Sequence, residues 1–405
     1  MFRNGPGNKR AGSTGAAHRS TPYRLACLVT VAVLTGCTTA TDRTTEPELH
    51  AGQLLTARPL TTAAAPANAD TKLITYISDD SHGEPIVVSG TVSVPKSTPP
   101  DGGWPVISWA HGTTGYADTC APSGDTPDGL AHEYVGPITA MLDTWVTRGY
   151  AVVQTDYQGL GTPGGHPYID GISEANTVTD IVRAAREVDS RIGTEWVVMG
   201  HSQGGQAALF TAQQAADRAP ELRLLGAVSI APGGVGIDQA VDLIRLGRPE
   251  AQAGQRFLPL LVLGAAVVDP SVDPDRIFSD QARPLLTTAR TACVAQVHDL
   301  PLVPPGQVFA PDADLDALRA YLELQDPVLL TPRVPVMLVQ GNRDDAVAPA
   351  GVEELAKALC AKEVDLEYRL YDGQDHRGVI DASLGDMEEF VDSVQAGESV
   401  DTCAR

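Results

Sequence analysis

Aromatic side chains are scarce in this sequence of 405 residues: Phe, Trp and Tyr together make up 5% of it. Surfaces that bind carbohydrates or single-stranded nucleic acids stack aromatic rings on their ligands, so this composition argues against both kinds of surface. The spacings that commonly hold zinc, C-x-x-C and H-E-x-x-H, do not occur either. We therefore expect neither a metal site nor a cofactor.

Positive charge is also in short supply. The chain has 29 Lys and Arg against 51 Asp and Glu, which gives a formal net charge of −22 at pH 7. An acidic chain repels a phosphate backbone, so nucleic acid is not an expected partner. The same field would repel anionic substrates and favour neutral ones such as esters.

The N-terminal segment has an apolar run, residues 25–35, that is too short to span a membrane as a permanent helix. Five basic residues and no acidic ones precede it, which indicates a signal peptide over residues 1–36 and leaves the exported chain at −27. The run ends in "LTGC", which resembles the lipobox of bacterial lipoproteins and implies acylation of Cys37 as the new N-terminus. The alternative is ordinary secretion, with cleavage near Thr39 or Ala40. The protein is thus expected at the extracellular face of the membrane or in the medium.

Residues 37–70 are rich in Thr, Ala and Pro and have no apolar period, so we interpret them as a disordered tether. Four cysteines remain after export, which is an even number in an oxidising compartment: Cys120, Cys293, Cys360 and Cys403. Two disulfides are the simplest interpretation, and the residues alone allow three pairings.

From residue 71 to 405 the pattern is that of one α/β domain. Residues 73–80 and 86–95 alternate like the strands of a hairpin joined by "SHGE". Strand-like stretches within 105–115, 150–161, 196–199, 224–232 and 334–341 then alternate with helical stretches over 134–148, 175–191 and 206–216. Such alternation predicts a mostly parallel sheet flanked by helices, with 196–199 as its central strand.

About a hundred residues separate the last two of these strands, which is far more than a crossover needs. This insertion, about 235–328, contains an apolar stretch at 257–268 and amphipathic helical segments. We expect a helical cap over the carboxyl ends of the strands, where open α/β sheets bind their ligands. A purely structural insertion is the alternative.

The stretch "GHSQG", residues 200–204, stands between the predicted central strand and the next helix. A serine in G-x-S-x-G at that place is typical of a nucleophile elbow, in which the glycines permit a sharp turn. Ser202 is therefore the candidate nucleophile. The backbone N–H of Gln203 would donate to the oxyanion, and a second donor would come from "HGTTG", with Thr113 preferred over Thr114.

A serine nucleophile needs a base and an orienting acid, which in this fold follow in the order Ser, acid, His. Asp344 and Asp345 follow the strand at 334–341, and they remain alternatives for the acid. His376 is the only histidine beyond them and is the candidate base. His298, within the cap, is a less favoured base.

The other nearby groups are expected to be structural. His201 adjoins the serine but would point away along the turn, and His111 would brace the oxyanion loop. His132 and His166 lie in loops that could line the pocket, and Asp375 is interpreted as a solvated loop acid.

These parts, in this order, resemble the α/β-hydrolase superfamily and, more narrowly, the secretory lipase family of fungal lipase A enzymes and their actinobacterial relatives. The resemblance runs from about residue 73 to 405 and is carried by "SGTVSVP", "HGTTGYADTCAPS", "DYQGLG", "GHSQGG" and the cap after "SIAP". The acid of that family stands three residues before a valine, as Asp344 stands to Val347, and its histidine follows about thirty residues later. The resemblance therefore implies a triad of Ser202, Asp344 and His376.

The same resemblance implies the pairings Cys120 with Cys293 and Cys360 with Cys403. Fungal members carry an acidic side chain in the oxyanion loop where this chain has Thr113 and Thr114, which leaves the second donor open. The implied activity is hydrolysis of lipid esters through an acyl-enzyme, with no chain length specified.

Three other functions stay open, one of which is peptidase activity, since this fold can host it, although no marker of a peptide-binding domain is visible. An acyltransferase would use the same triad and pass the acyl group to an alcohol, and a surface lipoprotein that binds lipid would keep the fold without the chemistry.

Overall fold

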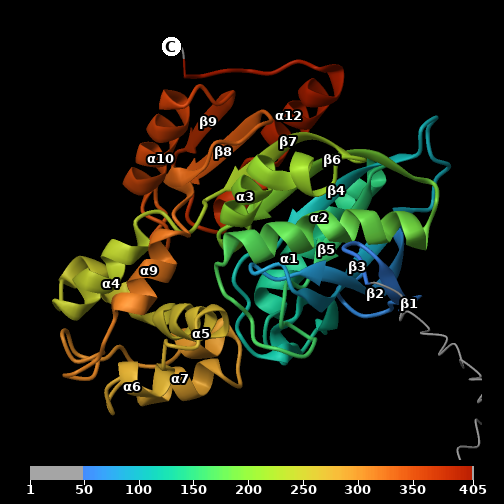
Figure 1. The fold of residues 1–405 in the computed structure, drawn as a ribbon. Helices are drawn as coiled ribbons and strands as arrows, with labels where there is room; N and C mark the ends of the chain where they lie inside the picture. The colour runs from blue at the N-terminus through green and yellow to red at the C-terminus, as the bar shows by residue number, and fades with distance from the viewer. Residues whose placement is uncertain (1–48, 404–405) are drawn as a thin grey trace, which may run out of the picture. The chain divides into compact units, whose positions relative to one another are not determined.

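The computed structural model describes residues 49–403 (Figure 1). The predicted signal peptide and residues 37–48 of the predicted tether, which include Cys37, lie outside the described residues. The strands are β1 Leu54–Pro59, β2 Ala69–Asp79, β3 Pro85–Pro95, β4 Trp104–Ala110, β5 Ala151–Thr155, β6 Ile192–His201, β7 Arg223–Ile230, β8 Val336–Gly341 and β9 Leu366–Tyr371. The helices beside the sheet are α1 His132–Thr147, α2 Gly171–Val188, α3 Gln203–Arg218, α10 Pro349–Ala361, α11 Gly378–Ala382 and α12 Leu384–Ala396, with short 3₁₀ turns η1 Asp118–Cys120 and η2 Pro122–Gly124.

The nine strands form one sheet in the order β1-β2-β3-β5-β4-β6-β7-β8-β9. Strands β1, β2, β3 and β5 pair antiparallel, and every pair from β5 to β9 is parallel. The predicted hairpin and mostly parallel sheet are confirmed, and β6 lies inside the parallel part. This is the α/β-hydrolase fold.

The predicted end of the tether at residue 70 is wrong, because β1 and the start of β2 fall within it. Strand β1 pairs with β2 through its backbone, and five of its six residues are exposed. An edge strand without a buried face has no apolar alternation, so its sequence resembles a polar linker.

Both faces of the sheet are buried, which explains why its central strands are continuous apolar runs. On β6, Trp196 and Val198 belong to the hydrophobic cluster that includes residues of α2, α3 and α10, whereas Val197 and Met199 belong to the cluster on the other face, with residues of α1, α11 and α12. Side chains alternate between faces along a strand, so four consecutive apolar residues serve two cores.

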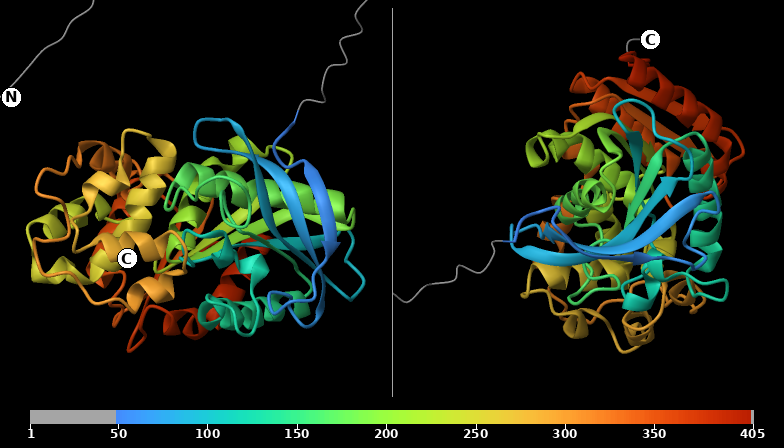
Figure 2. Two further views of the ribbon diagram at one scale, coloured as in Figure 1. Left: turned by 90° about the horizontal axis from the view of Figure 1, so that it is seen from below. Right: turned by 90° about the vertical axis from the view of Figure 1, so that its right-hand side faces the viewer.

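The insertion between β7 and β8 is helical, as expected from the sequence. Its helices gather at one end of the sheet, and the antiparallel strands β1–β3 lie toward the other end (Figure 2). It consists of α4 Ile237–Arg245, η3 Pro249–Arg256, α5 Leu258–Val268, α6 Pro274–Ile277, α7 Arg283–Ala289, α8 Val294–His298, α9 Asp316–Glu323 and η4 Pro327–Leu329. These elements bury a hydrophobic cluster of their own, which also includes Tyr168 and Ile169.

Helix α5 is apolar on all sides and forms the centre of that cluster, with its residues 258–265 buried. Among residues 49–403, no single helix has the length and apolar composition to cross a membrane; η3 and α5 together meet that test, with a bend of 61° between them.

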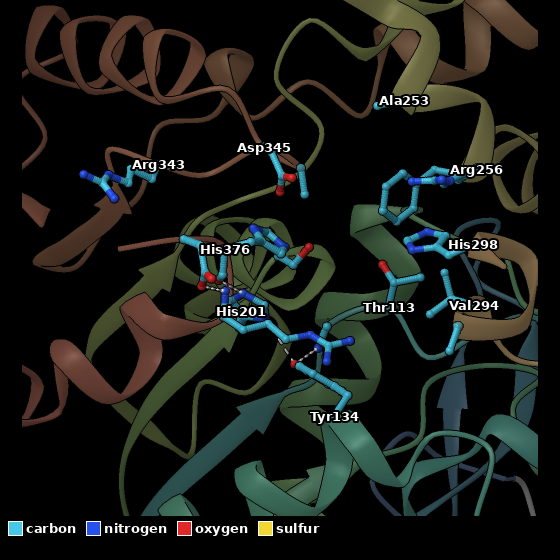
Figure 3. A pocket seen from close by; sticks show the side chains of 17 residues that line it. Thr113, Tyr134, His201, Ala253, Arg256, Val294, His298, Arg343, Asp345 and His376 are labelled. Atoms are coloured by element: carbon cyan, nitrogen blue, oxygen red, sulfur yellow. Dashed lines mark hydrogen bonds between the residues drawn. The ribbon is translucent and has the colours of Figure 1, made fainter. Parts of the chain in front are cut away.

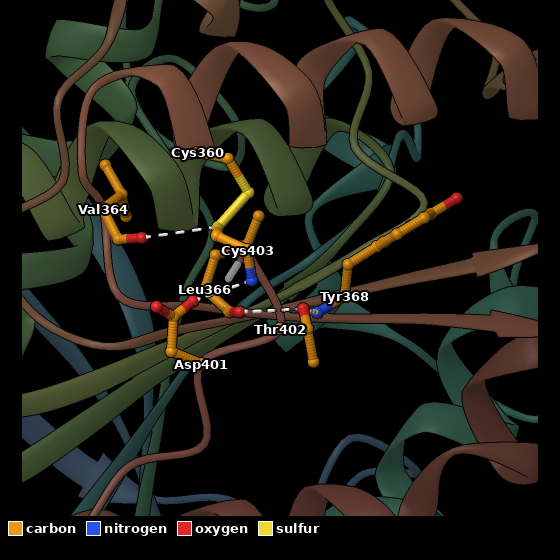
Figure 4. Close-up of a disulfide and its surroundings, with 7 residues drawn as sticks. All are labelled: Cys360, Val364, Leu366, Tyr368, Asp401, Thr402 and Cys403. Carbon is orange, nitrogen blue, oxygen red and sulfur yellow. Dashed lines mark hydrogen bonds between the residues drawn. A yellow bond between two sulfur atoms is a disulfide. The ribbon is translucent and has the colours of Figure 1, made fainter. Parts of the chain in front are cut away.

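Two disulfides are formed, with the pairing that the resemblance implied. Cys120–Cys293 joins the segment after β4 to the cap, and Cys360–Cys403 joins α10 to the C-terminal segment. Figure 4 shows that this segment also bonds to the edge strand of the sheet: the backbone N–H of Thr402 donates to the carbonyl of Leu366 on β9 over 2.8 Å. The second disulfide closes the part of the chain that carries His376.

Candidate active site

Ser202 lies in the tight turn between β6 and α3. Its backbone has φ 59° and ψ −116°, a conformation that a residue with a side chain adopts only under strain. The flanking glycines are required by space: a Cβ on Gly200 would lie 2.0 Å from the carbonyl oxygen of Gly204, and a Cβ on Gly204 would lie 1.9 Å from that of Ala110. The turn therefore has the geometry of a nucleophile elbow at the N-terminus of α3.

His376 and Asp344 meet in the loops after β9 and β8. The ring Nδ1 of His376 lies 2.7 Å from Oδ2 of Asp344, and the other carboxylate oxygen accepts the backbone N–H groups of Ala346 and Val347. Burial raises the pKa of Asp344, but the hydrogen bond and charge of His376, together with these N–H groups, outweigh burial and lower the pKa. Asp345, the alternative acid, is exposed and points into the cavity without bonding to the ring.

Ser202 and His376 line one cavity of about 420 Å³ between the sheet and the cap (Figure 3). Because Nδ1 of His376 donates to Asp344, Nε2 is the ring nitrogen left to accept a proton. Within residues 49–403, no hydrogen bond joins the side chains of Ser202 and His376, although both face this cavity. Such catalytic contacts often tighten only when substrate binds.

A second cavity of about 420 Å³ meets the first at Ser202 and Phe257. Gln203 lines this second cavity, whereas His376 does not. Its wall is mostly apolar and comes from the elbow, the segment after β7 and the cap, including Val235, Ile237, Val241, Ile244, Phe257 and Leu261. Ser202 thus lies between two cavities. We call the one lined by Gln203 the apolar cavity and the one lined by His376 the polar cavity.

His201 bonds to the backbone of the histidine loop, which agrees with its expected structural role. The expectation that its side chain points away is wrong, because its ring lines the cavity with its centroid 4.6 Å from that of His376. Its Nε2–H donates to the carbonyl oxygen of His376 over 2.8 Å, so its Nδ1 accepts from the hydroxyl of Tyr134 over 3.2 Å. That hydroxyl in turn accepts the backbone N–H of Gly112 over 2.6 Å. Burial, helped by the nearby His376, lowers the pKa of His201 to about 3, so the ring stays neutral.

The candidate oxyanion donors lie on both sides of Ser202. Gln203 is the first residue of α3, so its backbone N–H has no partner within the helix. Thr113 lines the cavity, and its hydroxyl bonds to that of Tyr168 over 2.8 Å. Thr114 is 2% exposed, and its carbonyl accepts the N–H of Val294 over 2.8 Å. Exposure to the cavity favours Thr113 over Thr114.

A buried polar cluster, which the sequence did not reveal, holds the Gln203 side chain. The amide nitrogen of Gln203 donates to Glu174 over 2.6 Å and to Nε2 of His166 over 3.0 Å. Burial raises the pKa of Glu174 well above its usual range and lowers that of His166 to about 3. Glu174 stands in the first turn of α2, where an acid is common, so no sequence signal marked it.

The remaining sequence candidates take the following places. His111 is buried and bonds to the carbonyl of Gly112, which braces the oxyanion loop, and burial lowers its pKa to about 4. His132 bonds to Asp125 over 2.6 Å and does not line either cavity. Asp375 accepts backbone N–H groups of its own loop.

His298 lines the cavity from the cap, and no described carboxylate bonds to its ring. Across residues 49–403, no group of three or more His, Cys, Asp or Glu side chains is arranged to hold a metal ion.

Comparison with known proteins places the chain in a hydrolase family. The profile of the family described as serine aminopeptidase, S33, matches residues 131–383, which is more than half of the chain. The chain belongs to this family. The matched segment contains Ser202, Asp344 and His376.

Two curated relatives of this S33 hydrolase are described as lipases. It is 28% identical to lipase A of Moesziomyces aphidis over 190 residues, 44% of this chain and 38% of the relative. It is also 28% identical to a probable inactive lipase of Mycobacterium tuberculosis over 167 residues, 39% of this chain and 36% of the relative. The chain therefore aligns with less than two fifths of the length of either.

Solved structures share the fold. Lipase A of Candida antarctica superposes with a TM-score of 0.74 at 20% identity, over 87% of this chain and 84% of that one. The rice cell wall degrading esterase LipA of Xanthomonas oryzae gives 0.67 at 19% identity, over 86% of this chain and 99% of that one.

Proposed function

We propose that this S33 hydrolase is a carboxylic ester hydrolase of the lipase or esterase type, which works through an acyl-enzyme on Ser202. The observation that carries the proposal is the 2.7 Å hydrogen bond between His376 and Asp344 beside a serine held in a strained elbow. The lipase and esterase relatives support ester substrates over other acyl compounds.

In the proposed first step, Ser202 Oγ bonds to the ester carbonyl carbon while its proton passes to Nε2 of His376. Asp344 keeps the ring in the correct tautomer and stabilises the imidazolium. The carbonyl oxygen, now an anion, accepts from the N–H of Gln203 and from the Thr113 segment, and losing one such donor typically costs about 100- to 1000-fold in rate. The tetrahedral intermediate then breaks its bond to the alcohol oxygen, which takes the proton from Nε2.

The second half of the reaction repeats these roles with water. Nε2 of His376 removes a proton from water as its oxygen bonds to the acyl carbon, and the bond to Ser202 breaks as Oγ regains a proton. The products are the free acid and the regenerated serine. A serine side chain has three staggered positions about a single bond, and in the proposed reaction Ser202 adopts the one that directs Oγ to Nε2.

The apolar cavity fits the acyl chain of such an ester. It starts at Ser202 and Gln203, where the acyl carbon and its oxyanion would lie, and continues between α4 and Phe257. Burial of each methylene there contributes about 0.8 kcal/mol, so binding should strengthen with acyl length until the cavity is full.

The test is covalent labelling of the intact protein with a serine-directed fluorophosphonate, followed by mass spectrometry of its peptides. We expect one adduct, on Ser202, and none in Ser202→Ala. Ser202→Ala should also abolish turnover of p-nitrophenyl butyrate, while the exposed Ser97→Ala should match wild type. Labelling at another serine, or turnover by Ser202→Ala within tenfold of wild type, would refute the mechanism.

Product analysis separates the related activities. An acyltransferase would form a new ester when an alcohol is added, whereas a hydrolase releases free acid regardless. Because the family is described as serine aminopeptidase, an aminoacyl anilide belongs in the same assay. Cleavage of the anilide in preference to the ester would replace esterase by peptidase as the proposed function.

We further propose that acylated Cys37 anchors the protein to the outer face of the membrane. Cys37→Ala should move the protein from the membrane fraction to the medium, and unchanged fractionation would contradict the anchor.

A further inference from the structure

His376, the proposed general acid, lines only one of the two cavities that meet at Ser202. In ester cleavage, the proton of His376 goes to the leaving alcohol oxygen, so the alcohol must lie on the His376 side. His376 lines the polar cavity and not the apolar one. The polar cavity is therefore the alcohol side of the site that we have proposed, and its lining determines which alcohols are accepted.

Two residues that line the far wall of this polar cavity each contain a buried nitrogen atom without a partner. Nε of Arg256 and Nε2 of His298 are both buried, and neither has a hydrogen-bond partner within residues 49–403. Arg256 ends η3 and His298 ends α8. Figure 3 places these two side chains together on the cap side of the cavity, across from His376. Fifteen buried side-chain polar atoms lack a partner within residues 49–403, and these two belong to neighbouring residues of one cavity.

The charges around the cavity leave Arg256 as a cation without a counterion. Arg377 pairs with Glu133 over 2.9 Å, and the carboxylate of Asp375 accepts the N–H of Gly378 over 2.7 Å. Arg343 and Asp345 stand at the exposed side of the cavity. None of the ion pairs among residues 49–403 includes Arg256. Removing a guanidinium partly from water without a carboxylate partner costs free energy, and an anionic ligand would offset this cost.

The edge of a guanidinium that carries Nε also carries one Nη, and together they present two parallel N–H donors. A carboxylate or phosphate accepts this pair in two parallel hydrogen bonds. We propose that the alcohol part of the preferred ester carries an anionic oxygen group, which binds Arg256 with His298 as a second contact. This assignment rests on the proposed ester hydrolysis.

The backbone is built to hold this subsite in place. Cys293, at the N-cap of α8, is joined by its disulfide to Cys120, and the neighbouring Val294 N–H donates to the carbonyl of Thr114. The helix that carries His298 is thus fixed to the oxyanion loop. The ring of His298 also packs edge-on against Phe257, with centroids 4.9 Å apart. A fixed distance between the oxyanion site and His298 is what selection of an alcohol requires.

The acidic net charge of the chain opposes anionic ligands at long range, as expected from the sequence. That field is screened over about 10 Å in 0.1 M salt, so charges within the cavity decide binding once the ligand has entered. Within the cavity, the attraction of Arg256 for an anion therefore exceeds the repulsion from the net negative charge of the chain.

The experiment compares three butyrate esters with related phenol leaving groups: 4-butyryloxybenzoate, 4-butyryloxyphenyl phosphate and the neutral methyl 4-butyryloxybenzoate. We expect wild type to favour at least one anionic ester in kcat/KM over the methyl ester. Arg256→Gln should reduce that preference about 10- to 100-fold, the range for hydrogen bonds to charged groups, and leave the methyl ester within about threefold. Arg256→Lys should retain part of the preference. The anionic ester that wild type favours shows whether the subsite prefers a carboxylate or a phosphate.

The matched control is Arg283→Gln, an exposed cap arginine on α7 that pairs with Asp280. It changes the net charge equally and should leave the preference intact. No anionic preference in wild type, or a preference that persists in Arg256→Gln, would overturn the assignment.

A binding measurement covers the case in which Arg256→Gln does not fold. Calorimetry on wild type should show tighter binding of 4-hydroxybenzoate than of methyl 4-hydroxybenzoate, and equal affinities would overturn the subsite. This measurement needs no turnover. If wild type hydrolyses none of the esters and Ser202 is not labelled, the proposed function fails, while the calorimetric result still decides whether the protein binds the anionic ligand more tightly than the neutral one.

Discussion

Replacing Tyr134 by Phe removes one hydroxyl that connects three parts of the candidate site. That hydroxyl accepts the N–H of Gly112 over 2.6 Å and donates to Nδ1 of His201 over 3.2 Å. His201 in turn holds the carbonyl of His376. Tyr134→Phe keeps the ring and its packing, so the change tests the polar chain alone.

The expected loss of stability follows from the two groups left without partners. The N–H of Gly112 and Nδ1 of His201 are both buried, and each such group costs about 1 to 3 kcal/mol when unpaired. The total of about 2 to 6 kcal/mol corresponds to a fall in Tm of about 3 to 8 °C, using an unfolding entropy of about 2.1 cal/mol/K per residue over residues 49–403.

The expected loss of activity is in kcat rather than in KM. Gly112 precedes Thr113 in the oxyanion loop, so loosening Gly112 misplaces a donor that acts in the transition state. Deleting such a donor typically costs about 100- to 1000-fold, and we expect about 10- to 100-fold for one that is displaced. KM for p-nitrophenyl butyrate should stay within about threefold of wild type, because this interaction forms mainly after substrate has bound.

The assay is steady-state hydrolysis of p-nitrophenyl butyrate together with thermal unfolding. Tyr150→Phe is the matched control, since its hydroxyl bonds only to Gln395 over 2.9 Å, on α12 and outside both cavities. It should leave kcat unchanged. A Tyr134→Phe variant that loses stability but retains full kcat would show that the chain from Gly112 to His376 is structural only.

Three further changes test other parts of the molecule. Asp344→Asn should lower kcat by at least about 1000-fold, because an amide cannot stabilise the imidazolium, while Asp345→Asn should stay within about threefold; similar losses in both would contradict the choice of acid. Burial lowers the pKa of His166 to about 3, below its usual 6.5, so its contribution to stability is present above pH 6.5 and is lost as the pH falls. Between pH 7 and 5, wild type should therefore lose about 2 kcal/mol more than His166→Asn in urea unfolding, and parallel pH profiles would refute this. Replacing Cys360 and Cys403 together by Ser opens a loop of 43 residues and should lower stability by about 4 kcal/mol with little change in kcat; an unchanged urea midpoint would argue against the bond.

The elbow could be predicted from sequence because it is a local constraint. Two glycines around one serine, between an apolar stretch and a helix former, describe a sharp turn, and the close approach of Gly200 to Gly204 lies within five residues. The parallel sheet was equally predictable, since strands buried on both faces must be continuously apolar. The length of the gap between β7 and β8 likewise marked the cap.

Strand β1 and the residues around the triad candidates were not predictable in this way. Strand β1 is held by backbone hydrogen bonds to β2, which leave no side-chain pattern. Tyr134 and Glu174 look like ordinary residues of a first helical turn. Their roles arise because folding brings them to His201 and Gln203, which are 67 and 29 positions away.

The sequence by itself determined which chemical groups are present and in what order, together with the local backbone of the elbow. The choice between Asp344 and Asp345 is a matter of direction: one carboxylate is turned to His376 by the N–H groups of its own turn, and the other faces the cavity. The tertiary structure shows that Asp344 is the carboxylate bonded to His376, and only it brought Arg256 and His298 from two cap helices to one wall. Contacts between segments far apart in the chain depend on packing, and neighbouring residues do not encode packing.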